Sequence, residues 1–231
     1  MHQNPTSRRA GFTLVELLVV ILIISILLTI GAAGFKNAGG KGVSTALAAT
    51  EALFDEARSI AVGKGTRARV LIDINDVNSE DTYLRRMVVA FEEIDEDGNP
   101  KENDWALAGK GYIFPAKTFF SQEYSNKDHK SGAGTLDEMN LTGVAGLYDG
   151  RWIYYEFNSE GICTTGLGGS GDYSAPSFVI GNGARGRGQE NPRTTSDGRR
   201  DFAGFVIQRN GATSIFRNPN QILGGEKPST F

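Results

Sequence analysis

The chain has 231 residues with 24 basic and 27 acidic side chains, which give a formal net charge of −3 at pH 7. This length allows one membrane anchor and one globular domain of ordinary size, and the slightly acidic balance indicates no polyanionic partner. Cys163 is the only cysteine, which excludes an intrachain disulfide. We expect it to be a small, buried and unreactive side chain.

The N-terminal region joins a basic leader to a long apolar segment. Two arginines precede Gly11, the apolar segment starts at Phe12, and residues 17–35 contain no charged side chain. One carboxylate, Glu16, falls inside the first turn of this segment. An isolated carboxylate in an apolar stretch is costly, so it indicates a partner for its charge.

Two ordinary interpretations of this segment stay open. A secretory signal peptide also places basic residues before an apolar run and is cleaved after that run, where Gly-Ala-Ala-Gly at residues 31–34 would serve. A plain transmembrane anchor also needs about 20 apolar residues. Neither interpretation accounts for Glu16.

A second helical pattern follows a predicted break over residues 36–42, which hold three glycines and two lysines. Apolar residues recur at three- and four-residue spacing from Leu47 to Ala61, which predicts a helix with one apolar face. Gly63 and Gly65 are typical of a helix C-terminus. If continuous, a helix over residues 12–62 would be about 75 Å long, and only its second half would need a globular domain to lie on.

The remaining sequence has the pattern of strands, and six or seven strands after one long helix predict an α+β fold with an antiparallel sheet. A two-residue turn is expected at Asn210-Gly211, and irregular loops are expected over residues 121–149 and 164–201. The predicted strands are residues 68–74, 86–94, 105–114, 151–157, 177–180, 205–209 and 212–217.

The junction at Gly11 resembles the processing site of type IV prepilins and type II secretion pseudopilins. The resemblance implies that prepilin peptidase cleaves between Gly11 and Phe12 and methylates the new N-terminus at Phe12. It also implies that Glu16 pairs with the terminal amine of a neighbouring subunit during assembly. The domains implied are a leader (1–11), a transmembrane and filament-core helix (12–35), an amphipathic continuation of that helix (36–63) and a periplasmic β-rich domain (64–231).

A looser resemblance extends beyond this junction. Residues 46–72, a helix that runs into a glycine and a first strand, are similar to the GspH/FimT group of minor pilins and pseudopilins. Trp105, Phe114-Pro115 and residues 157–161 also stand where that group tends to have a Trp, a Leu-Pro and a Phe-x-x-x-Gly. Major pilins commonly have a proline where this chain has Ala33, which favours a minor or divergent subunit.

The function implied is that of a structural subunit with no enzymatic activity and no cofactor. The precursor would cross the bacterial inner membrane once, with its two leader arginines in the cytoplasm and its C-terminal domain in the periplasm, and would enter a filament after processing. The implied partners are the prepilin peptidase, other pilin or pseudopilin subunits, the inner-membrane assembly platform and, before assembly, membrane lipid. A secretion pseudopilus and a type IV pilus both stay open.

An alternative function is a pilin that displays residues 164–201 for adhesion or DNA uptake. Acidic residues dilute the arginines of this stretch, and no aromatic residues alternate with them as stacking surfaces would require. A solvated loop is therefore favoured over a nucleic-acid site. The arginines concerned are Arg185, Arg187, Arg193, Arg199 and Arg200.

Two further patterns suggest small-molecule or metal sites. Asp95, Asp97 and Asn99 alternate as calcium ligands do, but Pro100 replaces the glycine that such a loop needs, so a calcium site and a plain exposed turn both stay open. Residues 181–186 fit G-x-G-x-x-G, but no helix is expected after them, as a dinucleotide site requires. A membrane-anchored enzyme has little support, because the only histidines are His2 and His129.

Overall fold

The computed structural model describes residues 18, 20–21, 38–168, 171–193 and 201–216. The chain divides into two compact units, Met1–Ala38 and Gly39–Phe231. In the first unit, Leu18, Val20 and Ile21 are helical and exposed, and the rest of the predicted apolar helix lies outside the described residues. Among the residues that the structure describes, no helix combines the length and apolarity needed to cross a membrane.

The helix α2 spans Ala38–Lys64, so the predicted break over residues 36–42 is wrong from Ala38 onward. A Cβ atom on Gly42 would lie 3.1 Å from the Thr118 hydroxyl oxygen and 3.6 Å from the Pro115 side chain. The helix therefore lies close against this loop, and a glycine at position 42 permits that approach rather than ending the helix.

The C-terminus of α2 has the hydrogen bonding of a Schellman motif. Gly65 has a φ of 69°, and the Thr66 amide donates to the Ala61 carbonyl oxygen at 3.2 Å. Glycine is favoured at this position because a left-handed backbone conformation strains residues that have a Cβ. Gly65 is thus the predicted cap, whereas Gly63 still belongs to the helix.

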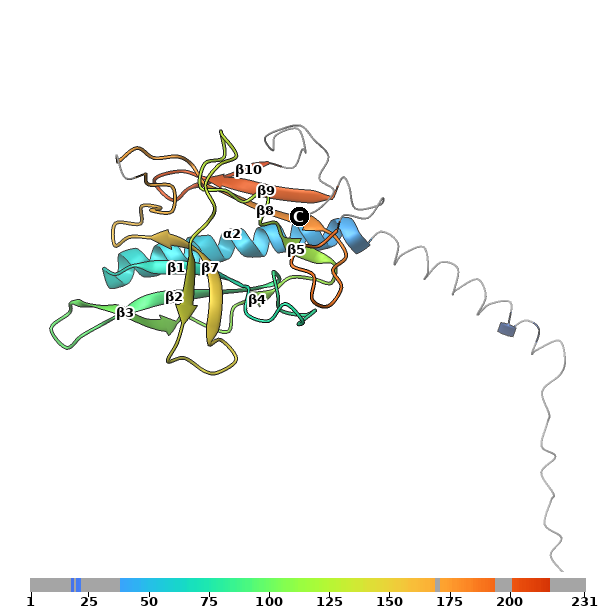
Figure 1. Ribbon diagram of the computed structural model, residues 1–231, viewed down its shortest axis with the longest axis horizontal. Helices are drawn as coiled ribbons and strands as arrows, with labels where there is room; N and C mark the ends of the chain where they lie inside the picture. The colour runs from blue at the N-terminus through green and yellow to red at the C-terminus, as the bar shows by residue number, and fades with distance from the viewer. Residues whose placement is uncertain (1–17, 19, 22–37, 169–170, 194–200, 217–231) are drawn as a thin grey trace, which may run out of the picture. The chain divides into compact units, whose positions relative to one another are not determined.

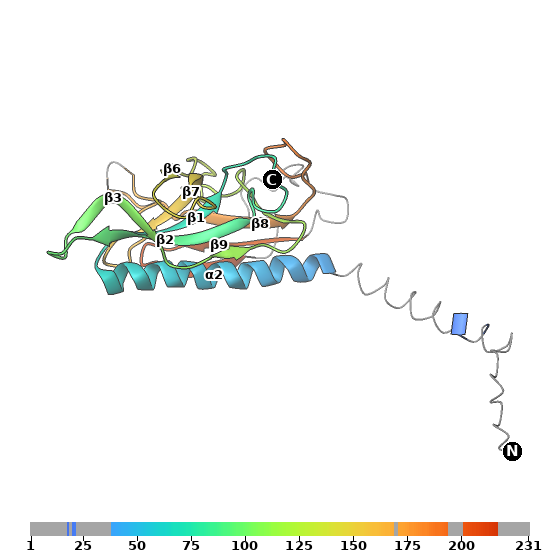
Figure 2. The same cartoon turned by 90° about the horizontal axis from the view of Figure 1, so that it is seen from below.

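The described strands form two antiparallel sheets, with α2 lying along both of them (Figures 1 and 2). The first sheet has the order β3-β2-β1-β7-β6, with β4 also paired to β2, and the second has the order β10-β9-β8-β5. The predicted α+β class is confirmed, with two sheets where the sequence indicated one. The strands are β1 (Ala68–Asp73), β2 (Arg86–Ile94), β3 (Pro100–Leu107), β4 (Tyr112–Ile113), β5 (Thr118–Phe120), β6 (Glu138–Leu141), β7 (Gly150–Phe157), β8 (Ser177–Asn182), β9 (Phe202–Ile207) and β10 (Thr213–Phe216).

Several strand predictions need correction. Residues 105–114 are not one strand: β3 ends at Leu107 and β4 starts at Tyr112. Between them Gly111 has a φ of 72° and lies so close to β2 that a Cβ would overlap the Met87 carbonyl oxygen. The sequence missed β5 altogether, and β6 lies inside the predicted loop of residues 121–149.

The turn between β9 and β10 also differs from its prediction. The Gln208 amide donates to the Ala212 carbonyl oxygen, and the Gly211 amide donates to the Gln208 carbonyl oxygen, both at 2.8 Å. Gly211 has a φ of 80°, whereas Asn210 has no positive φ. The connection is therefore a three-residue loop with a glycine bulge, and the predicted two-residue turn is wrong.

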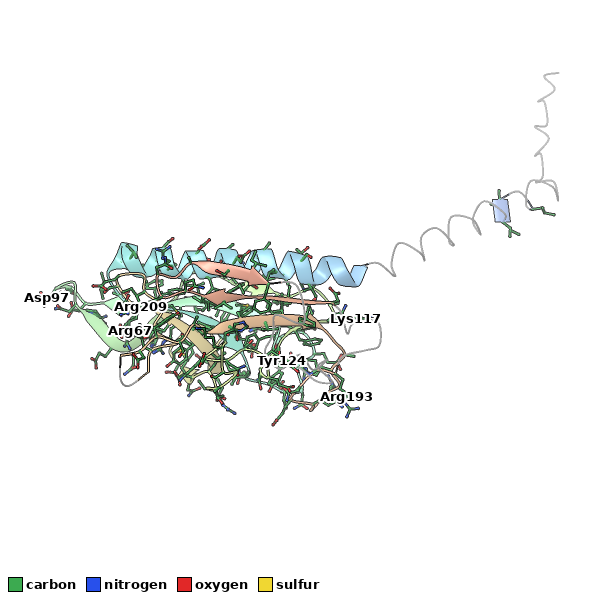
Figure 3. All side chains as sticks on the ribbon, turned by 90° about the horizontal axis from the view of Figure 1, so that it is seen from above. Arg67, Asp97, Lys117, Tyr124, Arg193 and Arg209 are labelled. Atoms are coloured by element: carbon green, nitrogen blue, oxygen red, sulfur yellow. The ribbon has the colours of Figure 1, made fainter. Side chains whose placement is uncertain are left out.

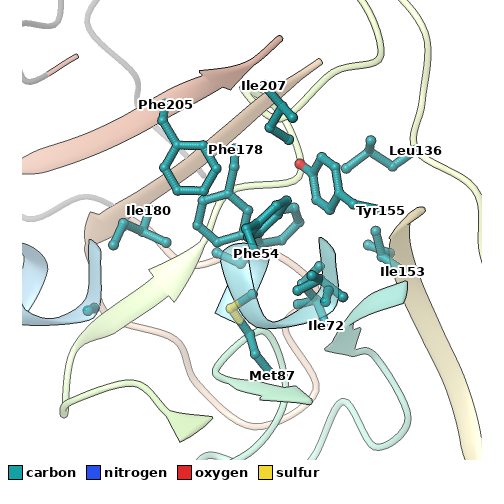
Figure 4. Close-up of a cluster of buried hydrophobic side chains, with 14 of the residues drawn as sticks. Phe54, Ile72, Met87, Leu136, Ile153, Tyr155, Phe178, Ile180, Phe205 and Ile207 are labelled. Carbon is teal, nitrogen blue, oxygen red and sulfur yellow. The ribbon is translucent and has the colours of Figure 1, made fainter. Parts of the chain in front are cut away.

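The core lies where α2 meets both sheets, around Phe54 (Figure 4). The Phe54 ring packs edge-on against Tyr155 of β7 at a centroid distance of 5.1 Å and against Phe205 of β9 at 5.0 Å. It also contacts Phe157 and Phe178. One helical side chain thus joins the two sheets, and α2 is part of the domain's core.

Candidate functional site

The predicted processing and assembly residues, Gly11, Phe12 and Glu16, lie outside the described residues, so their roles stay predictions. The structure does describe how the chain that follows them is held. The buried Thr50 hydroxyl donates to the Ala46 carbonyl oxygen at 2.8 Å, so this polar residue sits on the buried face of α2 without an unmet hydrogen bond. The buried face of α2 therefore accommodates this hydroxyl within its packing against the domain.

A buried tyrosine ties the two sheets together beneath α2. The Tyr155 hydroxyl of β7 donates to the Ser177 carbonyl oxygen of β8 at 2.6 Å. Burial raises the pKa of Tyr155 well above its ordinary value, so it stays a neutral donor. A force applied through α2 would therefore reach both sheets, through the Phe54 contacts and through this bond.

The face of the first sheet that points away from α2 carries a group of ion pairs, which we call the outer-face network: Arg67, Arg69, Glu92 and Glu156. Arg67 binds the Glu92 carboxylate with two nitrogens, Nη2 at 2.5 Å and Nε at 3.1 Å. Arg69 also contacts Glu156 with two nitrogens, but both approach the same oxygen, Oε2, with Nη2 at 2.6 Å and Nε at 2.8 Å. The register explains the second pair, because Arg69 lies directly opposite Glu156 on the neighbouring strand.

Aromatic rings cover the second of these arginines. The Arg69 guanidinium lies 4.2 Å from the ring centre of Trp105 and 4.0 Å from that of Tyr154. Guanidinium groups stack well on aromatic faces. Two aromatic rings and the Glu156 carboxylate therefore hold the Arg69 guanidinium. This arrangement is structural, because it leaves the guanidinium little access to a ligand.

Glu92 is the most enclosed carboxylate of the network, with only 2% of its side chain exposed. Burial alone would raise the pKa of Glu92, but the hydrogen bonds and charge of Arg67 outweigh it, so the pKa lies below its ordinary value of 4.5. The Asn103 amide also donates to this carboxylate at 3.3 Å. The sequence did not single out this pair, since its members are 25 residues apart and meet only through the pairing of β1 with β2.

The calcium candidates lie in the turn between β2 and β3. The Asp95 carboxylate accepts hydrogen bonds from the amides of Asp97 at 3.0 Å and Asn99 at 2.7 Å, and the bond from Asn99 is the main cause of its lowered pKa. The structure thus uses Asp95 to hold the turn. Within the described residues, no group of three or more histidine, cysteine or acidic side chains is arranged to hold a metal ion, and calcium binding stays a prediction.

The arginine-rich stretch is described as far as Arg193, and Arg199 and Arg200 lie outside the described residues. The Arg185 guanidinium donates to the carbonyl oxygens of Val77 and Ser79 and lies 4.8 Å from the ring centre of Tyr83. Arg187 is exposed and lies 3.8 Å from Glu80. Arg185 therefore fastens its loop to another loop, which weakens the nucleic-acid interpretation.

The glycine-rich pattern, the cysteine and the described histidine all take part in the packing of the domain. Gly181 belongs to β8, and Ala184 inside the G-x-G-x-x-G pattern forms a β-bridge with Arg193. The structure has no helix directly after the pattern, over residues 187–193, where a dinucleotide site requires one. Cys163 is buried, and burial raises the pKa of its thiol. His129 stacks on Phe216 at 5.4 Å.

Comparison with known proteins assigns the N-terminal segment. Residues 6–32 match the model of the prokaryotic N-terminal methylation motif. The crystal structure of the type IV minor pilin FimU of Pseudomonas aeruginosa (strain PAO1) is similar at 12% identity over 75% of this chain and 87% of that chain, with a TM-score of 0.38. No curated protein matches the sequence. The matched range includes Gly11, Phe12 and Glu16, and the chain therefore carries the N-terminal signal of the type IV pilins and pseudopilins.

Proposed function

We propose that this chain is a minor pilin-like, or pseudopilin, structural subunit that is assembled into a filament through its N-terminal helix. The observation that carries the proposal is the match of residues 6–32 to the N-terminal methylation motif. The packing of α2 around Phe54 is compatible with a structural role, because it fixes this helix firmly to the β-rich domain. The proposed role is structural, without enzymatic activity.

Processing is the first step of the proposal. Prepilin peptidase cleaves between Gly11 and Phe12 and methylates the amine of Phe12. Intact mass of the protein isolated from its native host membrane tests this step directly. We expect a chain that starts at Phe12 and carries one added methyl group. An uncut chain, or one cut beyond Gly34, would contradict the proposal.

A substitution at the cleavage site adds a control for this measurement. Gly11→Val places a branched side chain where the peptidase acts, and we expect the precursor to accumulate with residues 1–11 still attached. Ala10→Val, one residue earlier in the leader, is the matched control and should still be cleaved. Normal cleavage of Gly11→Val would show that the junction is not a prepilin site.

Assembly is the second step and depends on Glu16. A carboxylate in an apolar surrounding is costly unless a cation pairs with it, so pairing with the terminal amine of a neighbouring subunit sets the register between subunits. We expect Glu16→Ala to be cleaved and methylated normally but to be absent from filaments. Glu56→Ala, on the exposed side of α2, is the matched control and should enter them. Normal incorporation of Glu16→Ala would overturn this role.

The proposed location before assembly is the bacterial inner membrane, crossed once, with the β-rich domain in the periplasm. Its proposed partners are the peptidase, other pilin or pseudopilin subunits, the assembly platform and membrane lipid. A type II secretion pseudopilus and a type IV pilus are both compatible with the motif, and neighbouring genes distinguish them. A secretion ATPase with further pseudopilins indicates the first, and DNA-uptake genes indicate a competence pilus.

A further inference from the structure

The strand β6 carries a sequence pattern that the proposed filament role does not use. Residues 140–142 read Asn-Leu-Thr, the Asn-x-Ser/Thr pattern of an N-glycosylation acceptor, in which x is any residue except proline. No other asparagine of the chain fits the pattern, since Asn4 is followed by a proline. A pattern this short also arises by chance, so its surroundings in the fold decide whether it is a site.

Both polar residues of the pattern are accessible. Asn140 and Thr142 are exposed, whereas Leu141 between them is buried. The strand β6 is the last in the order of the first sheet, and among the described strands it pairs with β7 alone. Figure 2 shows β6 on the side of the domain away from α2, and Figure 3 shows side chains projecting from that side. Opening this short strand would break its pairing with β7 and leave the core around α2 in place.

The side-chain amide of Asn140 has no structural role that the described residues show. Other asparagines have partners: Asn75 donates to the Asp149 carbonyl oxygen at 2.7 Å, and Asn126 donates to that of Glu123 at 3.3 Å. Asn140 makes no side-chain hydrogen bond within the part of the chain that the structure describes. Asparagine is also depleted in β-strands, so neither strand formation nor hydrogen bonding accounts for it here. Its amide nitrogen is therefore available to an enzyme.

The space beside Asn140 can hold a sugar. An open recess of about 470 Å³ is lined by Glu138, Met139, Asn140 and Arg151. The strand register places Arg151 directly opposite Asn140, and its Nη2 atom lies 2.6 Å from a carboxylate oxygen of Glu138, with 65% of the Arg151 side chain exposed. A carboxylate accepts and a guanidinium donates hydrogen bonds, so the first sugar on Asn140 would find both kinds of partner for its hydroxyl groups.

We propose that Asn140 is an N-glycosylation site, which receives an oligosaccharide from a lipid-linked diphosphate donor on the periplasmic side of the membrane. The Asn140 Nδ2 atom forms a bond with the anomeric carbon of the first sugar. The bond between that carbon and the diphosphate oxygen breaks, the lipid diphosphate leaves, and one amide proton passes to a base of the transferase. The Thr142 hydroxyl is the group by which the transferase recognises the site. This inference rests on the proposed periplasmic location of the β-rich domain.

Peptide mass analysis of the protein isolated from its native host membrane tests the proposal. We expect the peptide that contains Asn140 to carry the added mass of sugar units, and we expect Asn140→Gln to lose it. The N-terminal peptide of the same digest reports cleavage before Phe12 separately. An unmodified Asn140 in a chain that starts at Phe12 would overturn this inference and leave the proposed function standing. Sugar mass that persists on the same peptide in Asn140→Gln would also overturn it.

Two substitutions at Thr142 separate recognition from folding. Thr142→Val keeps the shape of the side chain but removes the hydroxyl, and we expect the modification at Asn140 to be lost. Thr142→Ser keeps the hydroxyl and should retain the modification. Thr142 is exposed, so both variants should show the thermal midpoint of the parent when all three are produced in a host that lacks the transferase. Equal modification of the two variants would overturn the proposal.

Discussion

The two ends of strand β2 are stabilised in different ways. From Arg86 to Ala90 the strand is buried on both faces, with Met87 and Val89 in the core under α2 and Val88 and Ala90 in the cluster on the outer face. Beyond Glu92 the same strand enters the acidic arm, which we define as residues 93–104, and there Ile94 and the first five residues of β3 are exposed. The comparison teaches that hydrophobic burial holds the body of the domain, whereas ion pairs and local hydrogen bonds hold the arm.

The largest effect is expected where burial is greatest. Phe54→Ala removes the ring that joins both sheets, and replacing a buried phenylalanine by alanine costs about 3–5 kcal/mol of unfolding free energy. Denaturant unfolding of the full-length protein in detergent measures the loss, and Glu56→Ala on the exposed side of α2 should change it by less than about 0.5 kcal/mol. Comparable losses in both variants would show that α2 is not fixed through Phe54.

A smaller effect is expected where the body meets the acidic arm. Glu92→Gln removes the charge that Arg67 binds, and we expect a loss of about 2 kcal/mol, less than for a fully buried pair because Arg67 is 37% exposed. Glu93→Gln is the matched control, since its pair with Lys101 spans 3.9 Å between half-exposed side chains. It should cost less than about 0.5 kcal/mol.

The same pair predicts a pH dependence. The pKa of Glu92 is lower in the folded protein than its ordinary value of 4.5, so its contribution to stability is complete above that value and is lost as the pH falls through the folded pKa. The stability difference between the parent and Glu92→Gln should therefore shrink below about pH 4.5. A difference that is constant from pH 7 to pH 3 would mean that the charge of Glu92 is not what stabilises the junction.

Local patterns were enough to predict what depends on local patterns. The three- and four-residue spacing of apolar residues predicted the second half of α2. Short runs of strand-forming residues predicted β1, β2, β7 and β8. The processing junction is linear in the chain, so Gly11, Phe12 and Glu16 could be proposed without a structure, and their roles stay predictions. The short strands β5 and β6 have too few residues to give a periodic signal, and they form because longer strands offer them an edge.

Other features depend on contacts that no sequence window contains. Gly111 lies in the break between β3 and β4, against the Met87 carbonyl. Arg185 binds carbonyl oxygens more than 100 residues away in the sequence. A recess beside Arg67 combines residues from four separate segments, represented by Gly65, Glu92, Pro100 and Asn158. Such sites follow from strand order and register, which local periodicity does not specify.

The smallest effect is expected at the tip of the acidic arm. Asp95→Ala removes the carboxylate that accepts the amides of Asp97 and Asn99, so these amides should exchange their hydrogens faster while the global unfolding midpoint stays unchanged. Asp97→Ala removes an equal charge from a side chain that accepts no hydrogen bond within the described residues, and it should leave exchange at Asn99 nearly unaltered. If both variants speed exchange equally, the loss of negative charge alone accounts for the effect and the turn hydrogen bonds do not. If only Asp95→Ala does, a local turn maintains the shape of a segment that has no core of its own.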